Sequence, residues 1–380
     1  MSHELCIEEQ IRLTTTPDRP RLAVVGCGWW ATEFHIPGLI SYEKAELVGL
    51  VDADPDRLRA AYTAFGIATF RSISDLVSTV RVDGVVIATT SATHYRLALE
   101  ALATGCHVMV EKPMVLSASE AWDLVDRADR AGLHLQVGYT HHFTVSARRL
   151  RDVILGGEIG SILQVSGLYA TMVESYYRGQ PGDYEKVFNF SLTGPGASTY
   201  SDPQIAGGGQ GMTQVTHLIA AILWTTGRRV TEVSAFMEDT DLAVDLVDAM
   251  AFRLDNGAVC TIGSTGNLRP GEPQQQEVRY YGSRGFALQD LVHATVEIYY
   301  AGGRVEKVTA AEVGDPYPAS ATARGLADLI AGRGPNLAPG DVGARAAEFL
   351  EAAYASSNRG EHVRLDWNRG AESGKSQVKI

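Results

Sequence analysis

A glycine-rich turn directly after a short apolar run is the feature that most constrains the fold of this chain. Residues 22–25 are followed by Gly26-Cys27-Gly28-Trp29-Trp30-Ala31, and a helix is predicted from Ala31 to Tyr42. A strand–turn–helix unit of this kind presents backbone N–H groups and a helix N-terminus to a phosphate, and only small residues let the phosphate approach. Ala31 takes the third small position, where helix and strand pack closely. The pattern therefore predicts a dinucleotide-binding fold.

An acidic residue at the end of the next predicted strand indicates which dinucleotide binds. The strand 46–51 runs into Asp52, and the distance from Gly28 is close to the roughly 20 residues expected for a carboxylate that accepts both ribose hydroxyls. Such a carboxylate would repel a 2′-phosphate, and no Arg or Lys follows before Arg57. NAD is therefore favoured over NADP. The alternative is that Asp52 only begins the turn before Pro55.

The order of predicted elements divides the chain into an α/β part and an α+β part. The first part alternates strands with helices, which predicts a doubly wound parallel sheet; its strands are expected at 21–25, 46–51, 84–88, 107–110 and 134–138, and its helices at 31–42, 55–65, 74–78, 94–104 and 117–131. The second part has many consecutive strands with short turns, which predicts a large, mostly antiparallel open sheet; its strands are expected at 162–172, 230–238, 246–255, 258–263, 276–282, 286–290 and 295–300, and its helices at 145–155, 319–332 and 340–357.

These patterns predict four regions: an N-terminal extension (1–19), a Rossmann domain that binds NAD (20–138), an α+β domain for substrate binding and oligomerisation (139–367), and a disordered tail (368–380). Residues 173–211 form a long polar, aromatic-rich segment with little periodicity, and loops of that length are usually functional.

Composition excludes several classes of function. The formal net charge of −12 argues against binding to nucleic acid or to an anionic membrane surface. The four cysteines lack metal-ligand spacing and are expected to be reduced thiols, so no metal site is predicted. No apolar run reaches the roughly 18 residues of a spanning helix, and the first residues do not resemble a signal peptide. A cytoplasmic protein is expected.

Further motifs follow the glycine turn in a fixed order: His35-Ile36-Pro37, Thr93-His94, Glu111-Lys112-Pro113, Gly138-Tyr139, Gly207-Gly208-Gly209 before His217, Gly282-Ser283-x-Gly285, and the EAAYAS run at 351–356. With these motifs, the sequence from about residue 20 to 366 resembles the Gfo/Idh/MocA family, named after glucose–fructose oxidoreductase, inositol dehydrogenase and the rhizopine catabolism protein. The resemblance implies an NAD-dependent dehydrogenase or reductase that acts on a CH–OH group of a sugar, cyclitol or related polyol.

The resemblance also implies a reacting pair. Lys112 is expected to contact the nicotinamide ribose and the substrate, with Pro113 in a turn that is often cis, and His217 is expected to be the general base. A Lys at the C-terminal end of a parallel strand lies in the crevice where such sheets bind ligands. The family's Asp, four residues before the His, is Thr213 here; it cannot carry charge, but on the same helical face it is predicted to orient His217. The alternatives are a surface Lys112 and a His217 that only packs on the sheet.

Binding residues complete the expected site. The residues expected to bind the cofactor are Gly26, Gly28, Trp29, Trp30, Ala31, Asp52, Thr89, His94, Glu111 and Lys112. The residues expected to bind the substrate are Tyr139, His141, Glu174, Tyr176, Arg178, Thr213 and His217, with Tyr177 and Asp202 as further candidates. Thr140 and His141-His142 replace the Asn and Arg that usually follow Tyr139 in the family, so a different substrate pocket from that of the inositol and glucose enzymes is expected.

Two alternative functions are compatible with the sequence, and an oligomer is expected. An NAD-retaining epimerase, lyase or glycosidase that works through a transient keto-sugar is the first alternative. A nucleotide-sensing regulator is disfavoured, because a sensor does not need both Lys112 and His217. A homodimer or homotetramer is expected, since one face of a large antiparallel sheet must be covered or solvated. The residues expected at that contact are Leu246, Met250, Phe252, Val278 and Tyr280, with Asp248 among them.

Overall fold

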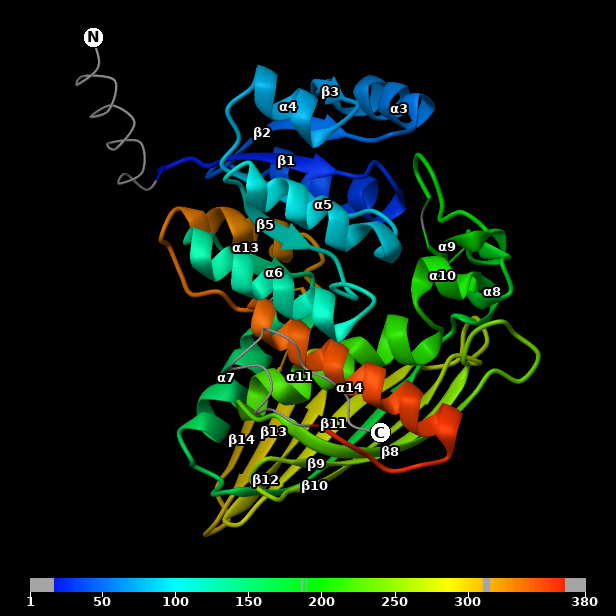
Figure 1. The fold of residues 1–380 in the computed structure, drawn as a ribbon. Helices are drawn as coiled ribbons and strands as arrows, with labels where there is room; N and C mark the ends of the chain where they lie inside the picture. The colour runs from blue at the N-terminus through cyan, green and yellow to red at the C-terminus, as the bar shows by residue number, and fades with distance from the viewer. Residues whose placement is uncertain (1–16, 186, 189, 310–314, 366–380) are drawn as a thin grey trace.

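The computed structural model describes residues 17–185, 187–188, 190–309 and 315–365, and it places two β-sheets one above the other (Figure 1). The predicted tail at 368–380, residues 1–16 of the predicted extension and Cys6 lie outside these ranges. The three described cysteines, Cys27, Cys106 and Cys260, are buried free thiols. Within the described ranges, no helix combines the length and the apolar character that crossing a membrane requires.

The first sheet confirms the predicted doubly wound fold. Its strands are all parallel in the order β3-β2-β1-β4-β5-β6, and they are β1 (Arg21–Val25), β2 (Glu46–Val51), β3 (Thr69–Phe70), β4 (Gly84–Ile87), β5 (His107–Val110) and β6 (Leu135–Val137). The connecting helices are η1 (Ala31–His35), α2 (Ile36–Ile40), α3 (Pro55–Phe65), α4 (Ile73–Thr79), α5 (Ser91–Ala103) and α6 (Ala118–Ala131). The short β3 was not predicted, and the helix expected at 31–42 is divided into the π-helical turn η1 and α2.

The two faces of this sheet are covered by helices from different parts of the chain. Side chains alternate along β1, so Leu22 and Val24 pack on one face while Ala23 and Val25 pack on the other. Helices α4, α5 and α6 cover the second face. Helices α2 and α3 cover the first face together with α13 (Ala321–Ile330), which comes from far along the chain and lies beside β5 (Figure 1). The first core is therefore completed by a segment that follows β14 (Val305–Val308), a strand of the second sheet.

The second sheet is mostly antiparallel, as predicted, and contains one parallel pair, β7 with β10. Its order is β14-β13-β12-β11-β7-β10-β9-β8-β15. The strands are β7 (Ile162–Ala170), β8 (Val230–Glu238), β9 (Val247–Leu254), β10 (Val259–Thr265), β11 (Gln275–Gly282), β12 (Gly285–Asp290), β13 (Thr295–Tyr300), β14 (Val305–Val308) and β15 (Val363–Arg364). The two edge strands β14 and β15 are short and were not predicted.

One face of the second sheet packs on α7 (Val145–Leu155), α11 (Thr216–Thr226) and α14 (Gly340–Arg359), which lie between it and the first sheet (Figure 1). The residues expected to form an oligomer contact, Leu246, Met250, Phe252, Val278 and Tyr280, are all buried within the protein. That part of the prediction is wrong. Period-2 alternation separates the two sets of side chains on a strand but does not say which set faces the core.

The opposite face of this sheet carries exposed apolar side chains. This face is therefore a candidate for an oligomer contact. Phe236 is 74% exposed, and Leu163 and Val259 are each at least half exposed. A shallow cavity of about 430 Å³ crosses β7, β10 and β11 on this side. Exposed apolar patches often mark protein interfaces. We therefore propose that this face, and not the buried set, contacts a second copy of the chain.

A change of charge on the open face tests this proposal. The protein is expected to show the mass of a dimer or tetramer by light scattering at micromolar concentration. Val259→Lys should shift the mass toward the monomer, because it places a charge at an exposed apolar position of this face. Ile40→Lys, at a similarly exposed position on α2, should leave the mass unchanged. A monomeric mass for the unmodified protein would refute the proposal.

Candidate active site

The glycine turn has the geometry that a dinucleotide requires. Gly26 adopts a φ of +101°, and a Cβ there would lie 2.5 Å from the carbonyl oxygen of Ala88. At Gly28, by contrast, a Cβ would meet nothing within 4 Å, so the space above the turn and the start of η1 is open. A pyrophosphate can therefore approach the backbone N–H groups at this helix N-terminus. The residues present fit NAD at this position.

The alternative role of Asp52, in the turn before Pro55, is seen in its hydrogen bonds, while its contact with the cofactor ribose stays a prediction. Its Oδ2 accepts a hydrogen bond from the backbone N–H of Cys27 (2.8 Å), and its Oδ1 accepts one from that of Asp54 (2.9 Å). The carboxylate thus fixes the glycine turn and also the turn that follows β2. It lines a cavity of about 360 Å³ beside Gly28. Arg57 and Arg71 line the same cavity, and the position of Arg71 there was not predicted.

The long segment 173–211 forms the other wall of this cavity. It contains short helices, α8 (Glu174–Tyr177), η3 (Pro181–Tyr184), α9 (Ser198–Ser201) and α10 (Pro203–Ala206), which lie beside the open end of the first sheet (Figure 1). The wall is built from both parts of the chain, and its residues include Trp29, Trp30, Thr89, Thr93, Gly194, Pro195, Gly196, Thr199 and Tyr200.

Aromatic contacts hold this segment against the glycine turn. The ring of Trp29 lies 5.7 Å from that of Phe188 and 5.2 Å from that of Phe190, measured between centroids. The backbone N–H of Ser191 donates to Glu33 Oε1 (2.8 Å) on η1. The segment therefore closes over the cofactor cavity.

Glu111 connects the glycine turn to the next functional strand. Its Oε1 accepts hydrogen bonds from Trp30 Nε1 (3.1 Å) and His35 Nε2 (2.9 Å), and its Oε2 accepts one from the backbone N–H of Lys112 (3.1 Å). Burial opposes ionisation of this carboxyl, but the hydrogen bond and charge of His35 and the charge of Lys112 outweigh it, so its pKa lies below the ordinary value. A Cβ on Gly138 would lie 2.6 Å from Oε1, which explains the glycine there.

Lys112 lies at the C-terminal end of β5, as predicted, and the Lys112–Pro113 peptide bond is cis. Its Nζ donates to the backbone carbonyl of Thr213 (3.1 Å), which brings the ammonium group to the helix that carries His217. Burial lowers the pKa of Lys112, although the nearby Glu111 carboxylate opposes this shift. The alternative of a surface lysine is therefore wrong.

His217 is buried on α11, one turn after Thr213. Burial, together with the charges of Lys112 and His141, holds its pKa well below 6.5, so the imidazole is neutral at neutral pH. Its ring centroid lies 5.6 Å from that of His141 and 6.1 Å from that of Tyr169, on which it stacks. Among the described residues its Nδ1 has no hydrogen-bond partner.

The structure changes the role expected of Thr213. Its hydroxyl hydrogen-bonds the carbonyl of Gly209 (2.9 Å) and the hydroxyl of Tyr177 (2.6 Å), and the prediction that it orients His217 is not supported by these contacts. The prediction assumed α-helical geometry. Residues Gly211–Val215 instead form the π-helical turn η4, in which the wider spacing alters which side chains align.

Other predicted residues lie around the pair or behind it. His141 is buried beside His217, and Tyr139 is buried with its hydroxyl 3.4 Å from Thr216 Oγ1. His94 lies behind the cavity wall, with its ring nitrogens near the carbonyls of Pro113 (2.9 Å) and Thr89 (3.1 Å). It supports the Lys112–Pro113 turn rather than contacting the cavity.

The candidates from the long segment mostly have structural contacts. Arg178 forms ion pairs with Glu174 (2.7 Å) and Asp241 (2.8 Å) at the protein surface. Asp202 caps α10 by accepting from the backbone N–H of Gln204. The Tyr176 ring packs between those of Trp29 (6.3 Å) and Tyr200 (5.3 Å). Of these residues, Tyr176 lies nearest to the cofactor cavity.

Sequence reasoning missed Tyr317, which reaches the site from the segment before α13. Its ring lies 5.2 Å from His141 and 6.3 Å from Trp30. Tyr169 and Tyr200 were also missed. A lone tyrosine in a loop or on an alternating strand gives no local signal of such a contact, because the contact depends on how distant segments pack.

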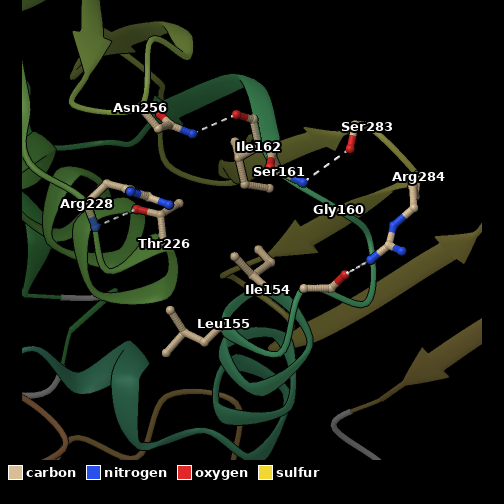
Figure 2. A pocket seen from close by; sticks show the side chains of 11 residues that line it. Ile154, Leu155, Gly160, Ser161, Ile162, Thr226, Arg228, Asn256, Ser283 and Arg284 are labelled. Atoms are coloured by element: carbon tan, nitrogen blue, oxygen red, sulfur yellow. Dashed lines mark hydrogen bonds between the residues drawn. The ribbon is translucent and has the colours of Figure 1, made fainter.

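A second cavity, of about 380 Å³, lies between the end of α7 and two hairpins of the large sheet (Figure 2). Arg284 donates to the carbonyl of Gly157 in the turn after α7, and Arg228 lies 3.6 Å from Asp255. A cation near a helix C-terminus is stabilising, which accounts for Arg284, while Arg228 is held by its ion pair with Asp255. The residues that line this cavity include no histidine, lysine or carboxylate, so the Lys112–His217 region is the candidate active site. The described parts of the chain contain no cluster of metal-ligating side chains.

Comparison with known proteins identifies the family. The model of an oxidoreductase family with an NAD-binding Rossmann fold matches residues 20–139, and the C-terminal domain model of the same GFO/IDH/MocA family matches residues 147–288. The rhizopine catabolism protein MocA of Rhizobium meliloti is 35% identical over 151 residues, which is 39% of this chain and 46% of that protein. An inositol 2-dehydrogenase of Leifsonia xyli subsp. xyli is 32% identical over 170 residues, 43% of this chain and 49% of that protein.

Each of these matches spans about half the length of the curated relative. A solved structure agrees over a longer range: the WlbA dehydrogenase of Bordetella pertussis, in complex with NADH and UDP-GlcNAcA, has a TM-score of 0.72 and 23% identity, with 92% of this chain and 100% of that chain covered. At this identity the likeness concerns the fold. The two family models and the site geometry together show that the chain belongs to the GFO/IDH/MocA family of NAD-binding oxidoreductases.

Proposed function

We propose that the protein transfers a hydride between NAD and a hydroxyl-bearing carbon of a sugar, cyclitol or related polyol. The observation that carries this proposal is the hydrogen bond from Lys112 Nζ to the carbonyl of Thr213, which brings the lysine to the segment that carries His217. Trp30, whose indole N–H donates to Glu111 next to Lys112, lines the cavity that Asp52 also lines. The names of the matched relatives, for rhizopine catabolism and inositol oxidation, support a polyol as substrate.

Lys112 is proposed to position the substrate oxygen. An ammonium group has three donors, and the carbonyl of Thr213 takes one, so Nζ can also donate to a substrate hydroxyl. A cation beside that hydroxyl favours its ionised form and so lowers its pKa. Because Glu111 holds Lys112 through both charge and backbone, the ammonium is fixed relative to the glycine turn.

His217 is proposed to take the hydroxyl proton. The buried imidazole is neutral, and its Nδ1, which has no hydrogen-bond partner among the described residues, is free to accept a proton. NAD, when bound, supplies the hydride acceptor. The aromatic rings of Trp30, Tyr200 and Tyr317 suit the apolar C–H face of a sugar ring and exclude water from the site.

The closure of the cavity supports a second candidate, an NAD-retaining epimerase, lyase or glycosidase. Phe188, Phe190 and Ser191 attach the long segment to Trp29 and Glu33, so this segment would slow the release of NAD from the cavity that it lines. A cofactor that stays bound could oxidise the substrate and later reduce the same molecule.

Substitution of the proposed reacting pair tests the first proposal. Lys112→Ala and His217→Ala should each lower turnover by about 100-fold to 10,000-fold, the range typical of lost acid–base groups, while NAD affinity changes little. Thr213→Ala should lower turnover much less, since the backbone carbonyl that accepts the hydrogen bond from Lys112 Nζ remains. His142→Asn, at a buried histidine stacked on Trp224, is the matched control. Near-normal turnover of His217→Ala would assign the proton to another group.

The predicted preference for NAD is tested at Asp52. NAD should bind more tightly than NADP, because the Asp52 carboxylate repels a 2′-phosphate. Asp52→Ser combined with Ala53→Arg should shift the preference toward NADP, helped by Arg57 and Arg71 in the same cavity. Asp54→Ser, which removes a neighbouring charge but keeps a capping hydroxyl, should not shift it. Equal affinity of the unmodified protein for the two cofactors would contradict the role of Asp52.

The fate of NAD separates the two proposed functions. A dehydrogenase should require added NAD and accumulate NADH as substrate is consumed. A retaining enzyme should be purified with bound NAD and should convert substrate with no added cofactor and no net NADH. Phe190→Ala should speed NAD dissociation measured by stopped flow, because it removes an aromatic contact to Trp29. An unchanged dissociation rate would show that the segment does not control cofactor release.

A further inference from the structure

Two acidic residues lie buried behind the reacting pair, and neither belongs to the proposed chemistry. Asp245 precedes β9, and Asp248 is the second residue of that strand. The Asp245 carboxylate accepts three hydrogen bonds: Oδ1 from the backbone N–H of Gly209 (2.7 Å) and from the Tyr354 hydroxyl (2.7 Å), and Oδ2 from the backbone N–H of Gly211 (2.6 Å). Asp245 thus grips the glycine-rich run from one side.

The glycines of this run are shaped around Asp245 and Tyr354. A Cβ on Gly209 would lie 1.9 Å from the Asp245 backbone oxygen, and one on Gly208 would lie 2.1 Å from the Tyr354 hydroxyl. Both distances are far shorter than van der Waals contact, so a side chain at either position would displace the run. The GGGxG sequence therefore serves a close approach of backbone to Asp245, not flexibility.

The hydrogen bonds of Asp245 affect the reacting pair through η4, the turn that follows the glycine-rich run. Gly211 begins η4, and the carbonyl of Thr213, two residues later, accepts the hydrogen bond from Lys112 Nζ. The hydroxyl of Thr213 hydrogen-bonds the carbonyl of Gly209, which lies within the gripped run. The position of the acceptor for Lys112 is consequently set by the carboxylate of Asp245.

We propose that Asp245 is a positioning residue whose carboxylate, through Gly209, Gly211 and the carbonyl of Thr213, sets where Lys112 Nζ meets the substrate hydroxyl. This inference rests on the proposed function of Lys112. Asp245 contacts neither the substrate nor the cofactor in this scheme, so its effect is exerted through the lysine.

The protonation state of the Asp248 carboxyl affects the net charge of this buried cluster of side chains. It is 3% exposed, and neither of its carboxyl oxygens has a hydrogen-bond partner among the described residues. The ionisable groups around it are Asp245, Tyr177 on α8 and Tyr354 on α14. Burial and the charge of Asp245 raise the pKa of Asp248 to about 9. At neutral pH the Asp248 carboxyl is therefore protonated and neutral.

A double-mutant cycle tests the positioning role. Asp245→Asn replaces one carboxylate oxygen with an amide NH₂ that faces a backbone N–H donor, so the run should shift. A displacement of about 1 Å near the chemistry can cost about 100-fold, and we expect a fall of that order in kcat with NAD affinity retained. In the Lys112→Ala background, Asp245→Asn should cost little more, because the group that it positions is gone.

The outcomes separate the inference from the proposed function. An Asp245→Asn effect of equal size in both backgrounds would mean a merely structural role and would overturn the inference. Full activity of Lys112→Ala would instead overturn the proposed function. Tyr354→Phe, which removes one donor to Asp245, should act in the same direction with a smaller effect if Asp245→Asn does not fold. Asp239→Asn, an exposed carboxylate in the same loop, is the matched control.

The protonation of Asp248 has its own readout. Its pKa is 3.8 in an unperturbed chain and about 9 in the folded protein, so over this range the folded state holds a proton that the unfolded state releases. Stability from this group is therefore lost as pH rises toward about 9. Asp248→Asn should gain Tm over the unmodified protein as pH rises through this window. A Tm difference that is constant with pH would show that Asp248 is ionised in the folded protein. That result would overturn the inference that its carboxyl is protonated at neutral pH.

Discussion

The carboxylate of Glu111 is the interaction on which the rest of the site depends. It lies between two structural units that the fold brings together, the helix that follows the glycine turn and the end of β5, and it binds Trp30, His35 and the backbone of Lys112. A buried charge is tolerated only when its oxygens are satisfied, and here three donors satisfy them. Hydride transfer requires cofactor and substrate to be positioned with a precision of a fraction of an ångström. A carboxylate that binds both the helix after the glycine turn and the backbone of Lys112 sets their relative position.

Much of the fold followed from local pattern, and the reason differs between the two sheets. In the parallel sheet, helices cover both faces, so apolar runs such as 84–87 are continuous and easily identified. In the second sheet, β9 alternates cleanly, yet the choice of Met250 and Phe252 as the outer face was wrong. The alternation was correct, but only the packing of α11 and α14 decides which face is inner. Short edge strands such as β15 were not predicted, because a strand of two residues is too short to show hydrophobic alternation.

The candidate site was predictable where its residues belong to motifs at the ends of strands. Gly26, Asp52 and Lys112 follow strands of one sheet, and parallel strands place their C-terminal ends along one edge. The contribution of Tyr317, Tyr169 and the 194–200 region was not predictable, since each arrives from a segment whose path depends on tertiary packing. The two π-helical turns, η1 and η4, were missed for another reason: an inserted residue in a helix leaves the hydrophobic pattern almost unchanged, although such turns often occur at functional sites.

The return of α13 to the first sheet has a consequence for how the protein is made. Leu326 and Ile330 cover apolar side chains such as Leu22 and Val86 that belong to the earliest part of the chain. A ribosome adds roughly 5–20 residues each second, so the interval between the synthesis of β6 and that of α13 is on the order of ten seconds or more. During that time the part of the first face that α13 covers remains exposed, beside the part that α2 and α3 already cover. The first sheet of the newborn chain therefore completes its core only after most of the second sheet has been synthesised.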